Sequence, residues 1–197
     1  MFPSKTFLSS LSLLAPALAI AAATPEHVPV RRQTIPSISP ETMFTVDAAA
    51  NTATCARSGI VDKFHNNNGH DLSTLVFYMY PLTSIGDRCE LLFLPSPGSR
   101  LWGSRQLDIY TLNARPANCS VAWTPGTGRN TSLGRIEVDP TRQVARWLYH
   151  SSSYLTYSSR CAPAGTVEGL EFVPVSEYDH VEWAQGQGYG VQIAYYL

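Results

Sequence analysis

The feature that most constrains the fold is a short apolar run, Cys89 to Leu94, which begins with a cysteine and is followed by Pro95. The run is too short for a stable helix, and the Pro-Ser-Pro-Gly that follows it is typical of a turn. We therefore expect one buried central strand over residues 88–95. Its cysteine can be cross-linked to a distant segment, with further strands on either side.

Similar short runs recur along the chain, separated by turns that contain Gly, Pro, Asn or Asp. They are Thr42–Val46, Cys55–Phe64, Leu72–Tyr80, Gln106–Leu112, Leu133–Val138, Val144–Tyr149, Thr166–Val175, Tyr178–Trp183 and Val191–Tyr196. This spacing predicts about nine to eleven short strands and no amphipathic helix. We expect an all-β fold, an antiparallel β-sandwich stapled by disulfides, with jelly-roll connections as one topology.

Two strand pairings are suggested by closeness in the sequence. The run Leu75–Tyr80 is the most β-prone of the chain, and we expect it to lie near the Cys89 strand after a turn at Thr83–Asp87. We also expect Tyr178–Trp183 and Val191–Tyr196 to pair with each other, because only a glycine-rich segment joins them.

Three segments break the strand pattern. Gln33–Pro40 has no hydrophobic period, which predicts a tail, and Gly59 lies within a strand run, where a β-bulge is expected. Arg115–Asn130 contains two prolines and two glycines and predicts a long, exposed loop.

The N-terminus is typical of a secretory signal peptide over residues 1–23. Lys5 precedes an apolar stretch, Phe7–Ile20, and small residues follow at Ala21–Ala23. The stretch is shorter than the roughly 20 residues that span a bilayer. The sequence therefore predicts a secreted protein, extracellular or held in a cell wall.

Residues 24–40 read as a propeptide or linker that contains the dibasic pair Arg31-Arg32. A kexin-like protease cuts such pairs, so the mature chain can begin at Gln33; the alternative is an ordinary solvated charge pair. Residues 41–197 are long enough for a single β-sandwich domain with one core.

The formal net charge is only −1 at pH 7, and no basic patch stands out. This composition argues against nucleic acid and against an anionic membrane as partners. We expect no membrane insertion and a monomer, with a cell-wall glycan or an extracellular protein as the partner.

Four cysteines, Cys55, Cys89, Cys119 and Cys161, are widely spaced. In a secreted chain such a set predicts two disulfides, for which three connectivities exist. No Cys-x-x-Cys or Cys-His cluster points to zinc, and we expect neither a metal nor a cofactor. Asn130 and Asn118 begin glycosylation sequons, and Asn130 is the stronger of the two because Cys119 occupies the middle position after Asn118.

The motifs in the second half of the chain resemble a known family. They are Cys89 with its apolar strand, then Cys161-Ala162-Pro163-Ala164-Gly165, then Tyr178-Asp179-His180-Val181-Glu182-Trp183, and finally Ile193-Ala194-Tyr195-Tyr196. Over Thr42–Leu197 this order resembles the fungal family called ubiquitin-three-binding protein, But-two C-terminal domain.

The resemblance implies a bond between Cys89 and Cys161, which leaves Cys55 for Cys119. The family name implies a ubiquitin-pathway partner, a cytosolic role that conflicts with a signal peptide. We therefore take over the fold and the extracellular fungal setting alone. The family pattern supplies no catalytic residue.

The closest polar constellation is His180 with Glu182, which project from the same side of a strand, opposite Asp179, Val181 and Trp183. An imidazole beside a carboxylate can serve acid–base chemistry or supply two metal ligands. We favour the alternative, a cross-strand polar pair on an exposed face, because no third ligand follows at a fixed offset.

Three other groups are weaker candidates for a site. His65, His70 and Asp71 flank an Asn-rich turn that can collect a cation, and Ser151–Ser153 follow His150 without the motif of a nucleophile. The third group is a set of acidic residues that can supply the paired carboxylates of a glycosidase. Its members are Glu168, Glu171, Glu177 and Asp179.

Flat aromatic side chains on exposed loops can stack against sugar rings. Trp123, beside Pro125 and Gly126, is the best candidate, and Trp102 before Gly103 is the second. The alternative is that the loop tryptophans cover open ends of the core while Trp147 and Trp183 lie inside it.

These observations favour a secreted, glycosylated fungal protein with a non-catalytic structural or binding role, and we expect no enzyme activity. Three alternatives remain open. They are a carbohydrate-binding module that uses loop aromatics, an extracellular hydrolase with paired carboxylates, and a secreted effector.

Overall fold

The computed structural model describes residues 36–64, 70–82, 88–142, 144–156 and 159–196. The chain divides into residues 1–33 and a compact unit of residues 34–197. The predicted signal peptide and the Arg31-Arg32 pair lie outside the described residues, as do His65 and the expected turn at Thr83–Asp87. Within the described ranges the unit forms fourteen strands and no helix, which confirms the all-β prediction.

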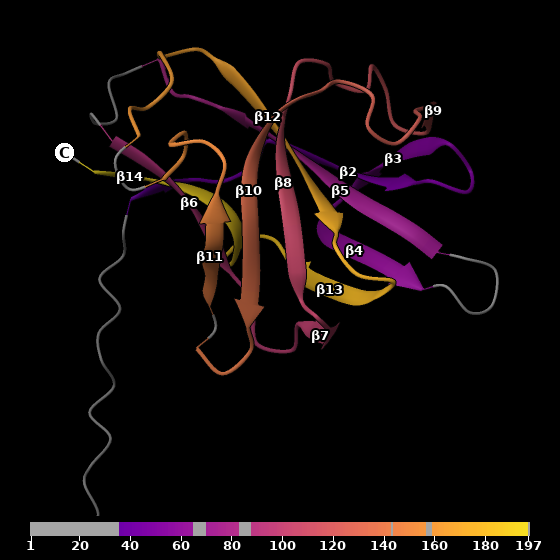
Figure 1. The fold of residues 1–197 in the computed structure, drawn as a ribbon. Helices are drawn as coiled ribbons and strands as arrows, with labels where there is room; N and C mark the ends of the chain where they lie inside the picture. Colours follow the sequence, from indigo (N-terminus) through magenta and orange to yellow (C-terminus); the bar gives the residue numbers. More distant parts are fainter. Residues whose placement is uncertain (1–35, 65–69, 83–87, 143, 157–158, 197) are drawn as a thin grey trace, which may run out of the picture. The chain divides into compact units, whose positions relative to one another are not determined.

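The strands form two antiparallel sheets that curl into a sandwich or half-barrel (Figure 1). The smaller sheet has the order β1 (Ser37–Ile38), β14 (Gly190–Tyr196), β6 (Arg88–Leu94). The larger has the order β11 (Val144–His150), β10 (Arg129–Asp139), β8 (Gln106–Leu112), β12 (Val167–Pro174), β5 (His70–Met79), β2 (Thr42–Asp47), β3 (Thr52–Ala56), β9 (Val121–Ala122). A branch joins β7 (Arg100–Gly103) to β13 (Tyr178–Ala184) and β13 to β4 (Ser58–Phe64), and β4 also pairs with β5.

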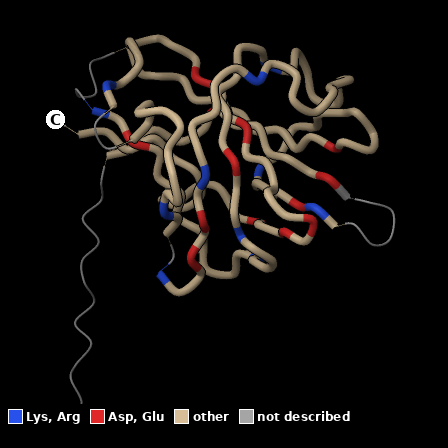
Figure 2. The backbone as a smooth tube through the Cα atoms, in the orientation of Figure 1, with Lys and Arg blue, Asp and Glu red and all other residues tan. Residues whose placement is uncertain are grey.

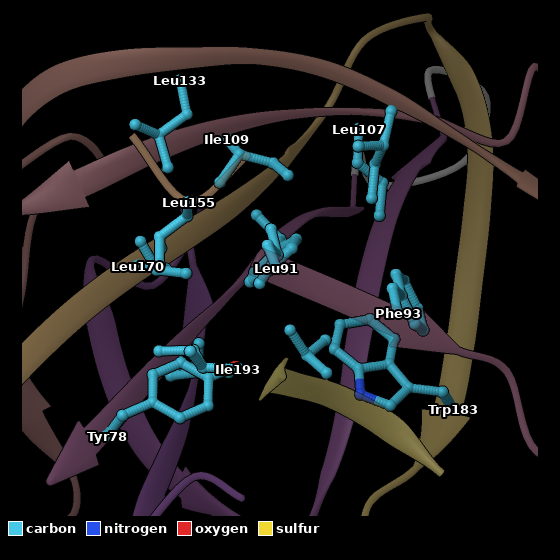
Figure 3. Close-up of a cluster of buried hydrophobic side chains, with 14 of the residues drawn as sticks. Tyr78, Leu91, Phe93, Leu107, Ile109, Leu133, Leu155, Leu170, Trp183 and Ile193 are labelled. Carbon is cyan, nitrogen blue, oxygen red and sulfur yellow. The ribbon is translucent and has the colours of Figure 1, made fainter. Parts of the chain in front are cut away.

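The main core lies between the smaller sheet and the inner face of the larger one (Figure 3). Phe93 of β6 packs against Trp183 of β13 and Phe172 of β12, with ring centroids 4.8 and 6.4 Å apart. Each such side chain contributes about 1.5–3 kcal/mol when it leaves water. This packing fixes β13, one face of which is inside while the other meets solvent.

The strand at Cys89 differs from the prediction of a buried central strand. β6 lies at the edge of the smaller sheet, and alternate residues along it are buried. Leu155 and Ser159 cover its other edge, because the amides of Leu91 and Cys89 donate to their carbonyl oxygens at 2.8 and 3.0 Å. The backbone amides of β6 that a neighbouring strand was expected to bind are therefore bound by residues outside any strand.

Both predicted pairings of sequence neighbours are wrong. β5 pairs with β12, β2 and β4, whereas β6 pairs with β14 in the other sheet. β13 pairs with β4 and β7 rather than with β14. In both cases the chain crosses from one sheet to the other, so short connections join strands that face each other across the core.

Two smaller expectations are also corrected. Gly59 does not form a bulge: it lies opposite Trp183 in a regular register, and a Cβ atom there would be 1.9 Å from the indole. Glycine is therefore present to make room for the ring. Within the predicted tail, Ser37–Ile38 form β1, which pairs with β14.

The two disulfides are Cys89–Cys161, which the family resemblance implied, and Cys55–Cys119, the pairing that was left for the other two cysteines. Cys89 is buried in the main core, and its bond ties β6 to the segment before β12. Cys55 and Cys119 are exposed, and their bond fastens the loop after β8 to β3.

Candidate functional site

The outer face of β13 carries the polar residues that the sequence singled out. Along this strand Asp179, Val181 and Trp183 are buried, whereas His180 and Glu182 lie on the opposite side. The predicted orientation of the His180–Glu182 pair is therefore confirmed. Because β7 and β4 flank β13, this face continues over three strands.

Trp102 of β7 lies directly across from His180 in the strand register. The indole stacks on the imidazole with centroids 4.9 Å apart and an interplanar angle of 3°. Trp102 nevertheless remains 42% exposed. The stack therefore holds a flat indole in one orientation while leaving much of its surface open to solvent, as predicted for a stacking aromatic.

Two more aromatic rings extend this surface. Phe64 of β4 makes edge contacts with Trp102 and with Tyr178, at centroid distances of 6.0 and 5.8 Å. Tyr178 is 46% exposed. We call the surface formed by Phe64, Trp102, Tyr178, His180 and Glu182 the Trp102 face. Sequence reasoning missed Phe64, whose only signal was its place at the end of a strand run.

A carboxylate lies near each nitrogen of the His180 imidazole. Asp62 Oδ1 lies 3.3 Å from His180 Nδ1, and Glu182 Oε2 lies 3.6 Å from His180 Nε2. Glu182 also lies 3.8 Å from Arg100, whose side chain is largely exposed. The rim of the Trp102 face therefore offers charged hydrogen-bonding groups of both signs. Among the described residues no set of three groups is placed to hold a metal ion.

A buried carboxylate fixes the backbone beneath this face. Asp179 accepts hydrogen bonds from the amides of Ser104, Arg105 and Ser176 and from the Ser104 hydroxyl, the last at 2.8 Å. These bonds tie the turn after β7 to β13. Sequence reasoning placed Asp179 among candidate catalytic acids, but its partners make it a structural anchor.

Gly103 reinforces the same anchor. Its φ is +77°, and a Cβ atom at this position would lie 1.7 Å from the carbonyl oxygen of Tyr178. Only glycine fits such an approach of two backbones. The end of the short strand that carries Trp102 is therefore fixed in two ways, by the hydrogen bonds to Asp179 and by the close packing of Gly103 on the Tyr178 backbone.

Trp123, the first candidate for an exposed stacking residue, is buried, so that prediction is wrong. It is 8% exposed and packs in a second apolar cluster with Phe44, Leu75 and Phe77 on the outer side of β2 and β5. Its amide donates to the carbonyl oxygen of Asn51 at 2.8 Å. The alternative weighed for the loop tryptophans, that they cover apolar surface, holds for Trp123.

The candidate glycosidase carboxylates do not converge. Glu171 is fully buried and paired with Arg129, which donates to both of its oxygens, and Glu168 accepts from Tyr154 Oη at 2.7 Å. Burial raises the pKa of Glu168, and the Tyr154 hydrogen bond partly offsets this rise. Glu168 and Glu171 lie on opposite sides of β12, as Asp179 and Glu182 do on β13.

The two sequon asparagines are at the surface. Asn118 lies beside the exposed Cys55–Cys119 bond, and Asn130 is at the start of β10. Both side chains are exposed, as a glycan requires. Charged positions are interspersed along the strands rather than gathered by sign (Figure 2).

No family model matches this sequence, and no curated protein matches it. The likeness to the But-two C-terminal domain family therefore stays a prediction. In the described part of the chain, no helix is long and apolar enough to cross a membrane.

Proposed function

We propose that this chain is an extracellular protein of fungal type that binds polysaccharide through the Trp102 face without cleaving it. The observation that carries the proposal is the exposed indole of Trp102, held flat on His180 and clamped from below by Asp179 and Gly103. A fixed aromatic surface binds with little loss of side-chain entropy, which favours affinity.

The chemistry of this face suits a pyranose ring. One side of such a sugar presents C–H groups, which pack on an indole, and its edge presents hydroxyls that both donate and accept. Glu182 can accept from those hydroxyls and Arg100 can donate to them. Phe64 and Tyr178 continue the aromatic surface across the neighbouring strands, so a chain of sugars finds contacts beyond the first ring.

Other features support an extracellular, cell-wall setting. Two disulfides form, and such bonds persist in oxidising compartments. The N-terminal segment has the pattern of a signal peptide, and Asn118 and Asn130 are exposed in glycosylation sequons. A hydrolase with paired carboxylates has less support, because Glu168, Glu171 and Asp179 each bind different partners.

Affinity electrophoresis tests the proposal. The mature protein is run through native gels that contain laminarin, yeast mannan, hydroxyethyl cellulose or glycol chitin. We expect at least one polysaccharide to retard the protein, and Trp102→Ala to weaken that binding about tenfold, since one stacked ring contributes about 1–1.5 kcal/mol.

Leu82→Ala is the matched control, because it also removes a large exposed side chain, one that lies elsewhere on the surface and is 87% exposed. It should leave the retardation unchanged. Migration unaffected by all four polysaccharides, or equal retardation of wild type and Trp102→Ala, would contradict the proposal.

A further inference from the structure

A second surface has the composition of a ligand site and was not found from the sequence. It is an open hollow of about 680 Å³ beside β11 and β6. Its lining consists of Glu90, Trp147, His150, Ser151, Ser152, Ser153 and Thr156. The volume lies within the range of about 300–1,000 Å³ that small-molecule sites occupy.

One wall of the hollow is aromatic. Trp147 is partly buried and packs against the main core, while its ring lies 5.0 Å from that of His150 at an angle of 51°. Packing on the core fixes the indole. The tilt of the imidazole leaves the two rings splayed rather than stacked, so they line the hollow as two separate surfaces.

The lining also contains a carboxylate that has no cationic partner among the described residues. Glu90 of β6 accepts a hydrogen bond from the Tyr196 hydroxyl at 3.2 Å on Oε2. Among the described residues Oε1 accepts no hydrogen bond and no arginine or lysine pairs with this side chain. A strong acceptor therefore borders the hollow.

The serines of the lining provide hydroxyl groups. Ser152 Oγ accepts from the Tyr154 amide at 3.1 Å, which leaves its hydroxyl proton free to be donated. Ser153 Oγ has no hydrogen-bond partner among the described residues, whereas the hydroxyls of Ser151 and Thr156 donate to the backbone at 2.7 and 2.6 Å. Two donors are thus available beside the acceptor.

We propose that this hollow is a second binding site, which takes a neutral sugar unit. Trp147 packs on the C–H face of the ring, Glu90 accepts from its hydroxyls, and Ser152 and Ser153 donate to them. An anionic ligand is disfavoured because no lysine or arginine lines the hollow in the described part of the chain, and Glu90 would repel it. The inference does not depend on the Trp102 face.

The test uses the Trp102→Ala protein, so that binding at the first surface is removed. Laminarihexaose, mannohexaose and cellohexaose are titrated into ¹⁵N-labelled protein while the indole N–H resonance of Trp147 and the amides of residues 150–153 are followed. We expect one hexasaccharide to shift these resonances in a saturable manner. Glu90→Gln should weaken this binding about tenfold, because it replaces a hydrogen bond to a charged acceptor by one to a neutral amide.

Glu90→Gln keeps the shape of the side chain and an acceptor for Tyr196, so folding should be retained, which the amide spectrum reports directly. Glu182→Gln serves as the control on the Trp102 face and should leave the Trp147 titration unchanged. Absence of any shift with all three sugars, or an equal affinity in Glu90→Gln, would overturn the proposal. Shifts produced by tetramethylammonium and not by the sugars would overturn it in favour of a cation site.

Discussion

Trp102 and Trp123 lie in similar sequence surroundings, close to glycines in segments between the main strand runs, yet they end in opposite environments. Trp102 is 42% exposed and Trp123 is 8% exposed. The difference lies in the sheet surface beneath each ring. Beneath Trp102 lies His180, a polar ring with a carboxylate near each nitrogen, whereas Trp123 covers the apolar side chains of Phe44, Leu75 and Phe77.

This comparison shows that the exposure of a loop aromatic is decided by its partner surface. β5 is apolar on both faces: Val76 and Tyr78 enter the main core, and Leu75 and Phe77 point outward. An outward apolar face needs a cover, and the loop after β8 supplies it with Trp123. The outer face of β13 carries the polar residues His180 and Glu182, so it needs no apolar cover.

The largest expected effect on stability is for Trp123, which covers the second apolar cluster. Trp123→Ala should lower the free energy of unfolding by about 3–5 kcal/mol, because it opens a cavity over the second apolar cluster. Trp123→Phe should cost less, since Trp123 Nε1 has no hydrogen-bond partner to lose among the described residues. Urea denaturation followed by circular dichroism measures both. A loss below 1 kcal/mol for Trp123→Ala would mean that the loop is not a cover.

The disulfide that fastens this loop gives the next effect. The double variant Cys55→Ser, Cys119→Ser should lower stability by about 2–4 kcal/mol, because the bond restricts the unfolded chain over a sequence separation of 64 residues. Its far-ultraviolet spectrum should stay that of a β protein, since Cys89–Cys161 and the main core remain. An unchanged urea midpoint would show that the Cys55–Cys119 bond is not needed to hold the loop with Trp123 on the second apolar cluster.

At the Trp102 face, we expect the buried Asp179 to contribute more to stability than the exposed ring of Trp102. Asp179→Asn should cost about 1–3 kcal/mol, because the neutral amide cannot serve all the donors that Asp179 binds. Glu182→Gln weakens the contacts of a half-exposed carboxylate with Arg100 and His180 at 3.8 and 3.6 Å, and should change stability by less than about 1 kcal/mol. Thermal unfolding of the two variants provides the measurement, and equal melting temperatures would contradict the assigned role of Asp179.

The smallest effect is expected for Trp102 itself. Trp102→Ala should lower stability by about 1 kcal/mol, the size of an aromatic contact at a surface. Equilibrium unfolding in urea, run beside Trp123→Ala, gives the comparison directly. A loss as large as that of Trp123→Ala would mean that Trp102 supports the fold rather than presenting a binding surface.

Local pattern predicted much of this structure. The alternation in Gln106–Leu112 appears as β8, with Leu107, Ile109 and Thr111 buried, and the turn at Asp139 separates the paired strands β10 and β11. These elements follow from side-chain period and turn chemistry, which are local properties. The inside and outside of β13 were predicted for the same reason.

Partners across the sandwich could not be predicted in this way. Which strand lies beside β6 or β13 depends on how the two sheets stack, and strands that follow each other in sequence are placed in different sheets. The Trp102 face joins residues from β4, β7 and β13, and the hollow joins β6 to β11. The sequence singled out only parts of each surface, such as His180 with Glu182 or His150 with Ser151–Ser153, because neither surface is contiguous in the chain.

Oxidation of individual tryptophans by N-bromosuccinimide, read by peptide mass spectrometry with and without the retarding polysaccharide, tests the central claim most directly. The account predicts that Trp102 reacts rapidly in the free protein and is protected by the polysaccharide, while Trp123 reacts slowly in both states. Rapid oxidation of Trp123, or oxidation of Trp102 at the same rate with and without polysaccharide, would contradict it.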